Sequence, residues 1–295
     1  MDWHKASGQK AHNETNVFKN DKNTKFSIIK MDFLPLQGQI QKEVKMKKIA
    51  MLFAMVWLAN ACFAQYAEPS VVPDRPGHSW DAEVTPHHKL ILDYGLGYEK
   101  GIDETRTFTL CNAVFRYGLF ENMELRVGTD FLVYENDATE PTFGIAPLAV
   151  GTKIKLYEGS GILPSVGMLA ELKSPHVGTK DQLPSHLAPS AYLLFEHSIG
   201  ERFNLCYNAG LEWDGETAAP TTYLALSLGY NITDDLGVFA ESNNYLHADG
   251  NKYMAEFGIT WLASRRVQLD LEADLDLMDI GKCYAIGCGI AWLIN

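Results

Sequence analysis

The stretch VQLDLEADLDLM, residues 267–278, alternates strictly between apolar and polar side chains. Valine, leucine or alanine fills every odd position, and the even positions carry the carboxylates Asp270, Glu272, Asp274 and Asp276. Because successive side chains of a strand point to opposite faces, this pattern predicts a β-strand with one oily and one acidic face. Such a strand must separate an apolar environment from a polar one.

Eleven further segments have a similar length, most of them alternate in the same way, and short turn signals divide them. The twelve segments cover residues 88–99, 106–118, 122–134, 145–157, 162–173, 189–199, 202–214, 221–232, 236–246, 252–263, 267–278 and 283–294. No segment of comparable length has the periodicity of an amphipathic helix. The sequence therefore predicts an all-β fold of about 12 strands.

Three of the apolar faces begin and end with an aromatic ring. They run from Phe203 to Trp213, from Tyr253 to Trp261 and from Tyr284 to Trp292. On a strand tilted near 40°, such rings lie roughly 20–25 Å apart, which matches the apolar band and the two aromatic girdles of an outer-membrane barrel. A soluble sandwich also alternates, but it has no reason to place rings at both ends of each face. We therefore predict a transmembrane antiparallel up-and-down β-barrel.

The connections between these segments alternate in length. Tight links fall at residues 120–122, 158–161, 200–202, 233–235 and 264–266, whereas the other connections include long ones at 135–144 and 174–188. Bacterial barrels have short turns on the periplasmic side and longer loops outside. An even number of strands places both termini of the barrel on the periplasmic side.

The N-terminal part of the chain predicts export. Residues 46–64 combine two lysines, an apolar run and a small-x-small ending, which is the pattern of a signal peptide cleaved between Ala64 and Gln65. A lipoprotein signal at Cys62 is a rival interpretation, but Asn60 fits such a site poorly. The predicted location is the bacterial outer membrane.

The signal peptide sets the predicted domain boundaries. Residues 1–45 precede it and are interpreted as a mis-assigned N-terminal extension. Residues 65–86, which are rich in proline, are predicted to be a periplasmic segment, and residues 87–295 to form the barrel.

Charge and cysteine usage exclude several classes of function. Residues 1–64 hold 10 of the 25 basic and 5 of the 37 acidic side chains, so the mature chain has a net charge of −17. Nucleic-acid binding requires a basic face, so no nucleic-acid partner is expected. The four cysteines after residue 64 form no CxxC pair, which argues against a zinc site or a disulfide framework. No cofactor is predicted.

The acidic face of residues 267–278 must point into the barrel, because a charged side chain facing lipid near the midplane costs up to several kcal/mol. Other charged and amide side chains share this inward position. The candidates for the lumen lining are Glu124, Arg126, Lys153, Lys155, Glu171, Lys173, Asn204, Asn208, Glu212, Glu256, Asp270, Glu272, Asp274 and Asp276. Two interpretations stay open: a polar path for a small solute, in which the carboxylates attract cations, or internal ion pairs that fill the barrel.

Several short motifs occur in a fixed order along the mature chain. They are DRPG (74–77), RYGL (116–119), ELRVG (124–128), GTKIKL (151–156), YNAGLEWDG (207–215), LSLGYNIT (226–233) and VQLDL (267–271). From about residue 70 to its end, the chain resembles the outer-membrane transporter family named after the meta-cleavage pathway of phenol degradation, in its Bacteroidetes form. The resemblance implies a barrel that transports small solutes, and the family name suggests hydrophobic or aromatic compounds. It carries over no catalytic or binding residue. The chain ends without a terminal aromatic, a role that Trp292 can take.

Such a barrel would have outer-membrane lipids and lipopolysaccharide, a small-molecule solute, and the barrel-assembly and periplasmic chaperone machinery as partners. Two other functions stay open. An enzyme of the lipase or deacylase type needs a nucleophile and a base in contact. Ser185 and His186 are adjacent in a long loop, but no GxSxG elbow is present, so no catalytic residue is predicted. A structural or adhesion barrel would act through the loop 174–188, whose polar side chains include His176, Lys180, Asp181 and His186.

Overall fold

The computed structural model describes residues 69–295 except residues 103 and 138. Outside this part of the chain lie the predicted extension 1–45, the predicted signal peptide 46–64 and its cleavage site between Ala64 and Gln65. Among the described residues, none of the helical segments has the length and apolar character needed to cross a bilayer.

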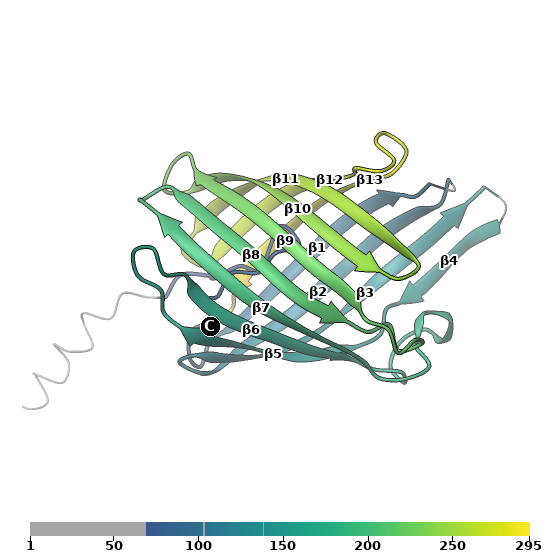
Figure 1. Ribbon diagram of the computed structural model, residues 1–295, viewed down its shortest axis with the longest axis horizontal. Coiled ribbons are helices and arrows are strands. Elements are labelled where there is room, and N and C mark those ends of the chain that lie inside the picture. Colours follow the sequence, from purple (N-terminus) through teal and green to yellow (C-terminus); the bar gives the residue numbers. More distant parts are fainter. Residues whose placement is uncertain (1–68, 103, 138) are drawn as a thin grey trace, which may run out of the picture. The chain divides into compact units, whose positions relative to one another are not determined.

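Thirteen β-strands of the described residues form one antiparallel sheet that closes on itself (Figure 1). Their bounds are β1 Leu90–Lys100, β2 Arg106–Phe120, β3 Met123–Asn136, β4 Thr139–Ile145, β5 Ala149–Tyr157, β6 Ser165–Lys173, β7 Ala188–Ile199, β8 Phe203–Glu212, β9 Thr221–Asn231, β10 Leu236–His247, β11 Gly250–Ser264, β12 Val267–Asp276 and β13 Tyr284–Leu293. The order in the sheet follows the chain, and β1 also pairs with β13, which closes the wall. The predicted up-and-down barrel is confirmed.

Strands β4 and β5 share one position in the wall. β4 pairs with the second half of β3, and β5 pairs with its first half. Pro147 lies in the break between them, and proline has no N–H to donate to a strand ladder. The barrel therefore has twelve strand positions, one of which is split, in agreement with the predicted number. The expectation of a long loop over residues 135–144 was wrong, because β4 begins at Thr139.

The tight turns lie together at one rim of the barrel, which we call the tight-turn rim. The first and last strands also meet there, since the N–H of Ile294 donates to the carbonyl of Leu90 at 2.8 Å. The opposite rim, the loop rim, has the longest connections, although β10 and β11 are joined there by a two-residue turn. Residues 174–187 between β6 and β7 form one of them, and it includes the 3-10 helix Lys180–Gln182. This division of short turns and long loops matches the predicted one.

Strand β12 has the two faces that its sequence predicts. Leu271 on one face is 58% exposed, and its neighbours Leu269 and Leu275 on that face are also exposed. Asp270 and Asp274 on the other face are buried inside the barrel. A wall that is apolar outside and hydrogen-bonded to itself throughout is the form in which strands can cross a bilayer.

Leu271→Arg is expected to lower the free energy of unfolding by about 2–4 kcal/mol, because it places a charge on the lipid-facing surface near the middle of β12. Leu277→Arg, at the loop rim just past the strand, should cost at most about 1 kcal/mol. Urea unfolding of protein refolded into lipid vesicles measures both values. Equal losses at the two positions would show that this surface does not face a bilayer.

Candidate functional site in the barrel lumen

Residues 69–86, which we call the lumen segment, form a loop inside the barrel. The N–H of Val71 donates to the carbonyl of Arg265 at the tight-turn rim, at 2.7 Å. The chain returns to the same rim, where the N–H of His88 donates to the carbonyl of Gly118 at 2.8 Å. Between these points, the segment contacts inward-facing side chains of the wall. We expected a periplasmic segment over residues 65–86, and the described part of it lies in the lumen instead.

A buried cluster of ions holds the first half of the lumen segment. Arg116 on β2 has no exposed surface, and its guanidinium lies 3.2 Å from Asp74 of the segment. Lys153 on β5, also without exposed surface, donates to Asp74 at 2.7 Å, and Arg126 on β3 pairs with the same carboxylate. Three cations of three different strands therefore meet at one carboxylate.

The same cluster continues into the wall. Arg116 donates to Glu124 at 3.0 and 3.1 Å and to Asp93 at 3.1 Å. It also donates to the main-chain carbonyl of Val72 at 2.7 Å. Buried charges are stable in proteins when they are paired in this way.

The surrounding cations shift the acidity of Asp74. Burial by itself acts to raise the pKa of this carboxyl, but the charges of Arg116, Lys153 and Arg126 outweigh burial and hold its pKa well below the ordinary value. The carboxylate form is therefore the one that the cluster stabilises at neutral pH.

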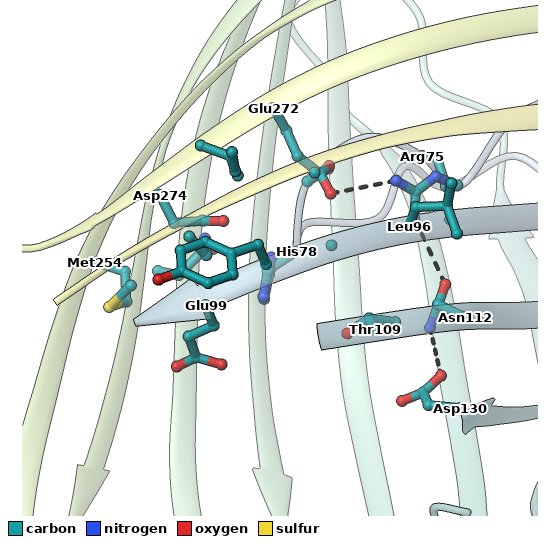
Figure 2. A pocket seen from close by; sticks show the side chains of 18 of the residues that line it. Arg75, His78, Leu96, Glu99, Thr109, Asn112, Asp130, Met254, Glu272 and Asp274 are labelled. Atoms are coloured by element: carbon teal, nitrogen blue, oxygen red, sulfur yellow. Dashed lines mark hydrogen bonds and ion pairs between the residues drawn. The ribbon is translucent and has the colours of Figure 1, made fainter. Parts of the chain in front are cut away.

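Arg75, the next residue, contacts the adjoining part of the wall. Its guanidinium donates to Asp270 at 3.1 Å and to Glu272 at 3.2 Å, both on β12. Two glycines of the wall leave room for this guanidinium, because a Cβ on Gly95 or Gly289 would lie 2.4 or 2.2 Å from its atoms. Asp74 and Arg75 thus anchor the lumen segment to two adjoining parts of the barrel wall. Figure 2 shows Arg75 between Glu272 and the wall strand of Asn112.

The apex of the segment lies nearer to the loop rim. The N–H of His78 donates to Glu241 at 3.0 Å, and its Nδ1 lies 3.2 Å from Glu256. Partial burial acts to lower the pKa of His78, but the hydrogen bond and charge of Glu256, with Asp274 and Glu241, raise it to about 9. Trp80 follows, and its main-chain N–H and carbonyl both bind the Asn208 amide, at 2.8 and 2.9 Å.

The ring of Trp80 packs into an aromatic cluster on the wall. Its centroid lies 4.8 Å from that of Tyr192 and 6.0 Å from that of Tyr223. Tyr223 in turn contacts Tyr245 at 5.2 Å and donates its hydroxyl to the carbonyl of His78. These rings give the lumen an aromatic surface over β7, β9 and β10.

The descending half of the segment is held by hydrogen bonds and ion pairs. Asp81 binds Lys153 at 3.1 Å, and Glu83 binds Lys155 at 2.7 Å. Thr85 donates its N–H and its hydroxyl to Glu124 at 2.6 and 2.7 Å. The whole segment therefore rests mainly on polar contacts.

Two cavities flank the lumen segment. The larger, of about 530 Å³, lies toward the loop rim, where Tyr98, Glu99 and Met254 line it (Figure 2). The smaller, of about 300 Å³, lies against β2, β3, β5 and β6 and reaches the split strand at Pro147. Arg75, Gly77 and Trp80 line both cavities, so both adjoin the segment.

Most of the predicted lumen-lining residues meet at the lumen segment. Those in direct contact with it are Glu124, Arg126, Lys153, Lys155, Asn208, Glu256, Asp270 and Glu272. Others line a cavity beside it: Glu171 and Lys173 the smaller one, Glu212 and Asp274 the larger one. Asn204 instead donates to Glu196 at 3.0 Å, and Asp276 accepts from the N–H of Met278 at the loop rim.

Sequence reasoning missed several residues of this site. Arg116 and Asp93 each lie in a segment that was predicted as a strand, and a charged residue in the middle of a membrane strand must face inward. That rule would have found both residues. The partners in the lumen segment, Asp74, Arg75 and His78, carry no comparable signal, because no periodicity relates them to the wall.

Comparison with solved structures finds barrels of the same fold. An outer membrane channel from Pseudomonas putida F1 has a TM-score of 0.54 at 13% sequence identity, over 74% of this chain and 100% of that chain. The KdgM porin has a TM-score of 0.50 at 9% identity, over 70% of this chain and 99% of that chain. At these identities the likeness concerns the fold alone. Comparison with curated proteins gives no match.

The sequence also matches a protein family over most of its length. The family is described as "Putative MetA-pathway of phenol degradation", and the match covers residues 74–294. It begins at Asp74, the centre of the buried ion cluster, and includes all thirteen strands. This confirms the resemblance in the motifs, and the chain belongs to this family.

Proposed function

We propose that the protein is an outer-membrane channel that carries small solutes, hydrophobic and aromatic compounds among them, through its lumen. The observation that carries this proposal is a closed wall, apolar outside and polar inside, that encloses cavities of about 530 and 300 Å³ around a segment held by polar contacts. The two similar structures are an outer membrane channel and a porin, which supports a transport role.

The lumen segment is the gate in this proposal. Its anchors are ion pairs and hydrogen bonds, whose partners can bind water when the segment leaves. The Trp80 ring packs on Tyr192 and Tyr223, and Val71 packs in a small apolar cluster with wall residues near the tight-turn rim. Movement of the segment toward that rim would therefore open a path mainly by exchanging polar contacts for contacts with water.

The larger cavity favours solutes with a positive charge or an aromatic ring. Five carboxylates line it, and one Lys and one Arg oppose them. The carboxylates are Glu99, Asp130, Glu212, Glu272 and Asp274. The rings of Trp80, Tyr98, Tyr223 and Tyr245 also line this cavity and can stack on an aromatic solute or contact a cation.

Measurement of the reversal potential in a planar bilayer under a salt gradient tests the proposal. We expect cation-selective current, and neutralisation of Asp270, Glu272, Asp274 and Asp276 to their amides should reduce the cation-to-anion permeability ratio several-fold. The matched control neutralises four exposed carboxylates of the loop rim: Glu104, Glu140, Glu216 and Asp249. Absence of both current and solute flux, in the native protein and in a variant without the lumen segment, would refute a channel.

The proposal assigns no catalytic role. In the loop 174–188, Nδ1 of His186 lies 3.2 Å from the carbonyl of Gly215, and the N–H of Ser185 donates to Glu216. These contacts support a structural role for Ser185 and His186, the two residues that an enzyme of the lipase or deacylase type would use. The remaining partners in the proposal are outer-membrane lipids and lipopolysaccharide around the wall, and the assembly and chaperone machinery that delivers barrels to the membrane. An adhesion role through the loop would show as partner capture that depends on residues 174–188.

A further inference from the structure

A histidine and two carboxylates meet at the apex of the lumen segment. They are His78 of the segment, Glu256 of β11 and Asp274 of β12. One donor atom from each, an imidazole nitrogen and two carboxylate oxygens, lie within 4.8 Å of one another. Solute passage does not require these three groups to gather, so their convergence calls for a separate explanation.

The carboxylate of Glu256 is incompletely satisfied. Its side chain has no exposed surface, and Oε2 lies 3.2 Å from His78 Nδ1 and accepts from Asn243 at 3.3 Å. Its second oxygen, Oε1, is buried and has no hydrogen-bond partner in the described part of the chain. This oxygen faces the segment, 3.6 Å from where a Cβ on Gly77 would lie. A buried acceptor without a partner costs about 1–3 kcal/mol, which a bound cation would remove.

The electrostatic surroundings also favour a cation. Among the described ion pairs, no lysine or arginine contacts Glu256 or Asp274. Arg75, the nearest arginine of the segment, is engaged with Asp270 and Glu272. Glu241 adds a third carboxylate beside His78. Among the described ion pairs, Glu256 contacts His78 alone, and closely spaced carboxylates of this kind attract further positive charge.

We propose that His78, Glu256 and Asp274 bind a divalent transition-metal cation of the Zn²⁺ type. Imidazole nitrogen and carboxylate oxygen are ordinary ligands of Zn²⁺, whereas Ca²⁺ and Mg²⁺ bind oxygen almost exclusively. Zn²⁺ bonds of about 2.0–2.2 Å require the three donors to close by about 1 Å. Half of the His78 side chain is exposed, so its ring can make this adjustment.

The cation would enter from the larger cavity. His78 and Asp274 both line that cavity, together with Glu99 and Met254 (Figure 2). Space beside them allows water to complete the coordination shell. Imidazole binds Zn²⁺ in its neutral form, so the affinity should be measured at a fixed pH.

A cation at this site would join the lumen segment to the wall. His78 belongs to the segment, and the two carboxylates belong to neighbouring strands, β11 and β12. A ligand that binds only the closed arrangement stabilises that arrangement by mass action. The site therefore goes beyond the proposed channel role and provides a metal-dependent lock on the segment.

Calorimetric titration of the folded full-length protein in detergent with ZnCl₂, after removal of bound metal with EDTA, tests the site. We expect one Zn²⁺ per chain, and His78→Gln and Asp274→Asn should each weaken binding at least about tenfold. Asp276→Asn is the matched control, because Asp276 lies two residues further along β12 and instead accepts from the N–H of Met278. That variant should bind Zn²⁺ as the native protein does. Each variant is first shown to be folded by its heat-dependent shift on a gel.

Three outcomes would overturn the proposal. These are absence of saturable Zn²⁺ binding, equal affinity in the native protein and in folded His78→Gln and Asp274→Asn, and binding of Ca²⁺ or Mg²⁺ in preference to Zn²⁺. X-ray absorption of the Zn²⁺ complex provides a second measurement, with one imidazole nitrogen among oxygen ligands expected. None of these measurements depends on ion or solute flux, so failure of the metal site and failure of the channel role are distinguishable.

Discussion

Deletion of residues 71–84, which joins Ser70 to Thr85, is expected to raise the single-channel conductance on the order of tenfold. The deletion removes the part of the lumen segment that lines the two cavities. Arg116, Arg126 and Lys153 lose the carboxylate of Asp74, but water entering the open lumen would solvate them. Planar-bilayer recording at fixed salt concentration measures the change.

A second variant serves as the control for misfolding of the deletion variant. Asp74→Asn combined with Arg75→Gln keeps the length of the segment and removes its two ionic anchors. This variant should open more often than the native protein while its fully open level matches that of the deletion. An unchanged conductance in a correctly folded deletion variant would show that the lumen segment does not obstruct the pore.

Arg116→Ala is expected to lower the free energy of unfolding by about 3–5 kcal/mol, the usual cost of removing one partner from a buried ion pair. Arg116 has no exposed surface and pairs with Asp74, Asp93 and Glu124. Its loss leaves Asp93, one of whose oxygens already lacks a described partner, without its cation. Urea unfolding in lipid vesicles, followed by tryptophan fluorescence, measures the loss.

Arg106→Ala supplies the comparison on the same strand. Arg106 pairs with Asp137 at the loop rim, where both side chains are exposed, and such a pair contributes less than about 1 kcal/mol. Arg116→Lys should give an intermediate loss, because lysine keeps the charge without the planar fork that reaches several acceptors. If Arg116→Ala costs no more than Arg106→Ala, the buried cluster contributes no net stability.

Much of the fold could be predicted from the sequence because burial is periodic in a membrane barrel. The outward leucines of β12 and the aromatic Trp261 and Trp292 are exposed, as their alternation indicates. Strand β4 could not be predicted in this way. Its sequence contains Pro141, and it pairs only with β3 in the sheet, so neither its hydrogen bonding nor its exposure repeats regularly.

Of the candidate site, only the residues of the barrel wall could be predicted from the sequence. The inward direction of Asp270 and Glu272 follows from the lipid that their strand must face on the other side. Their partner Arg75 lies 195 residues from Asp270 along the chain, in a segment without periodicity. The sequence left two interpretations open, a polar path for a solute and internal ion pairs that fill the barrel. Internal ion pairs are present in this structure, but they form with the inserted segment as well as within the wall. Such long-range partners depend on the tertiary fold.

The return of the lumen segment to the rim from which it enters has a mechanical consequence. Val71 and His88 are both held at the tight-turn rim, so the segment is a hairpin and not a thread through the barrel. A force that pulls on residue 69 from that side would act on the contacts of the first half of the segment one after another. Val71 would bear it first, then the Asp74 cluster, then Arg75. Bonds that bear a force one after another break at a lower force than the same bonds bearing it together. The segment can therefore be pulled out of the barrel stepwise from the tight-turn rim.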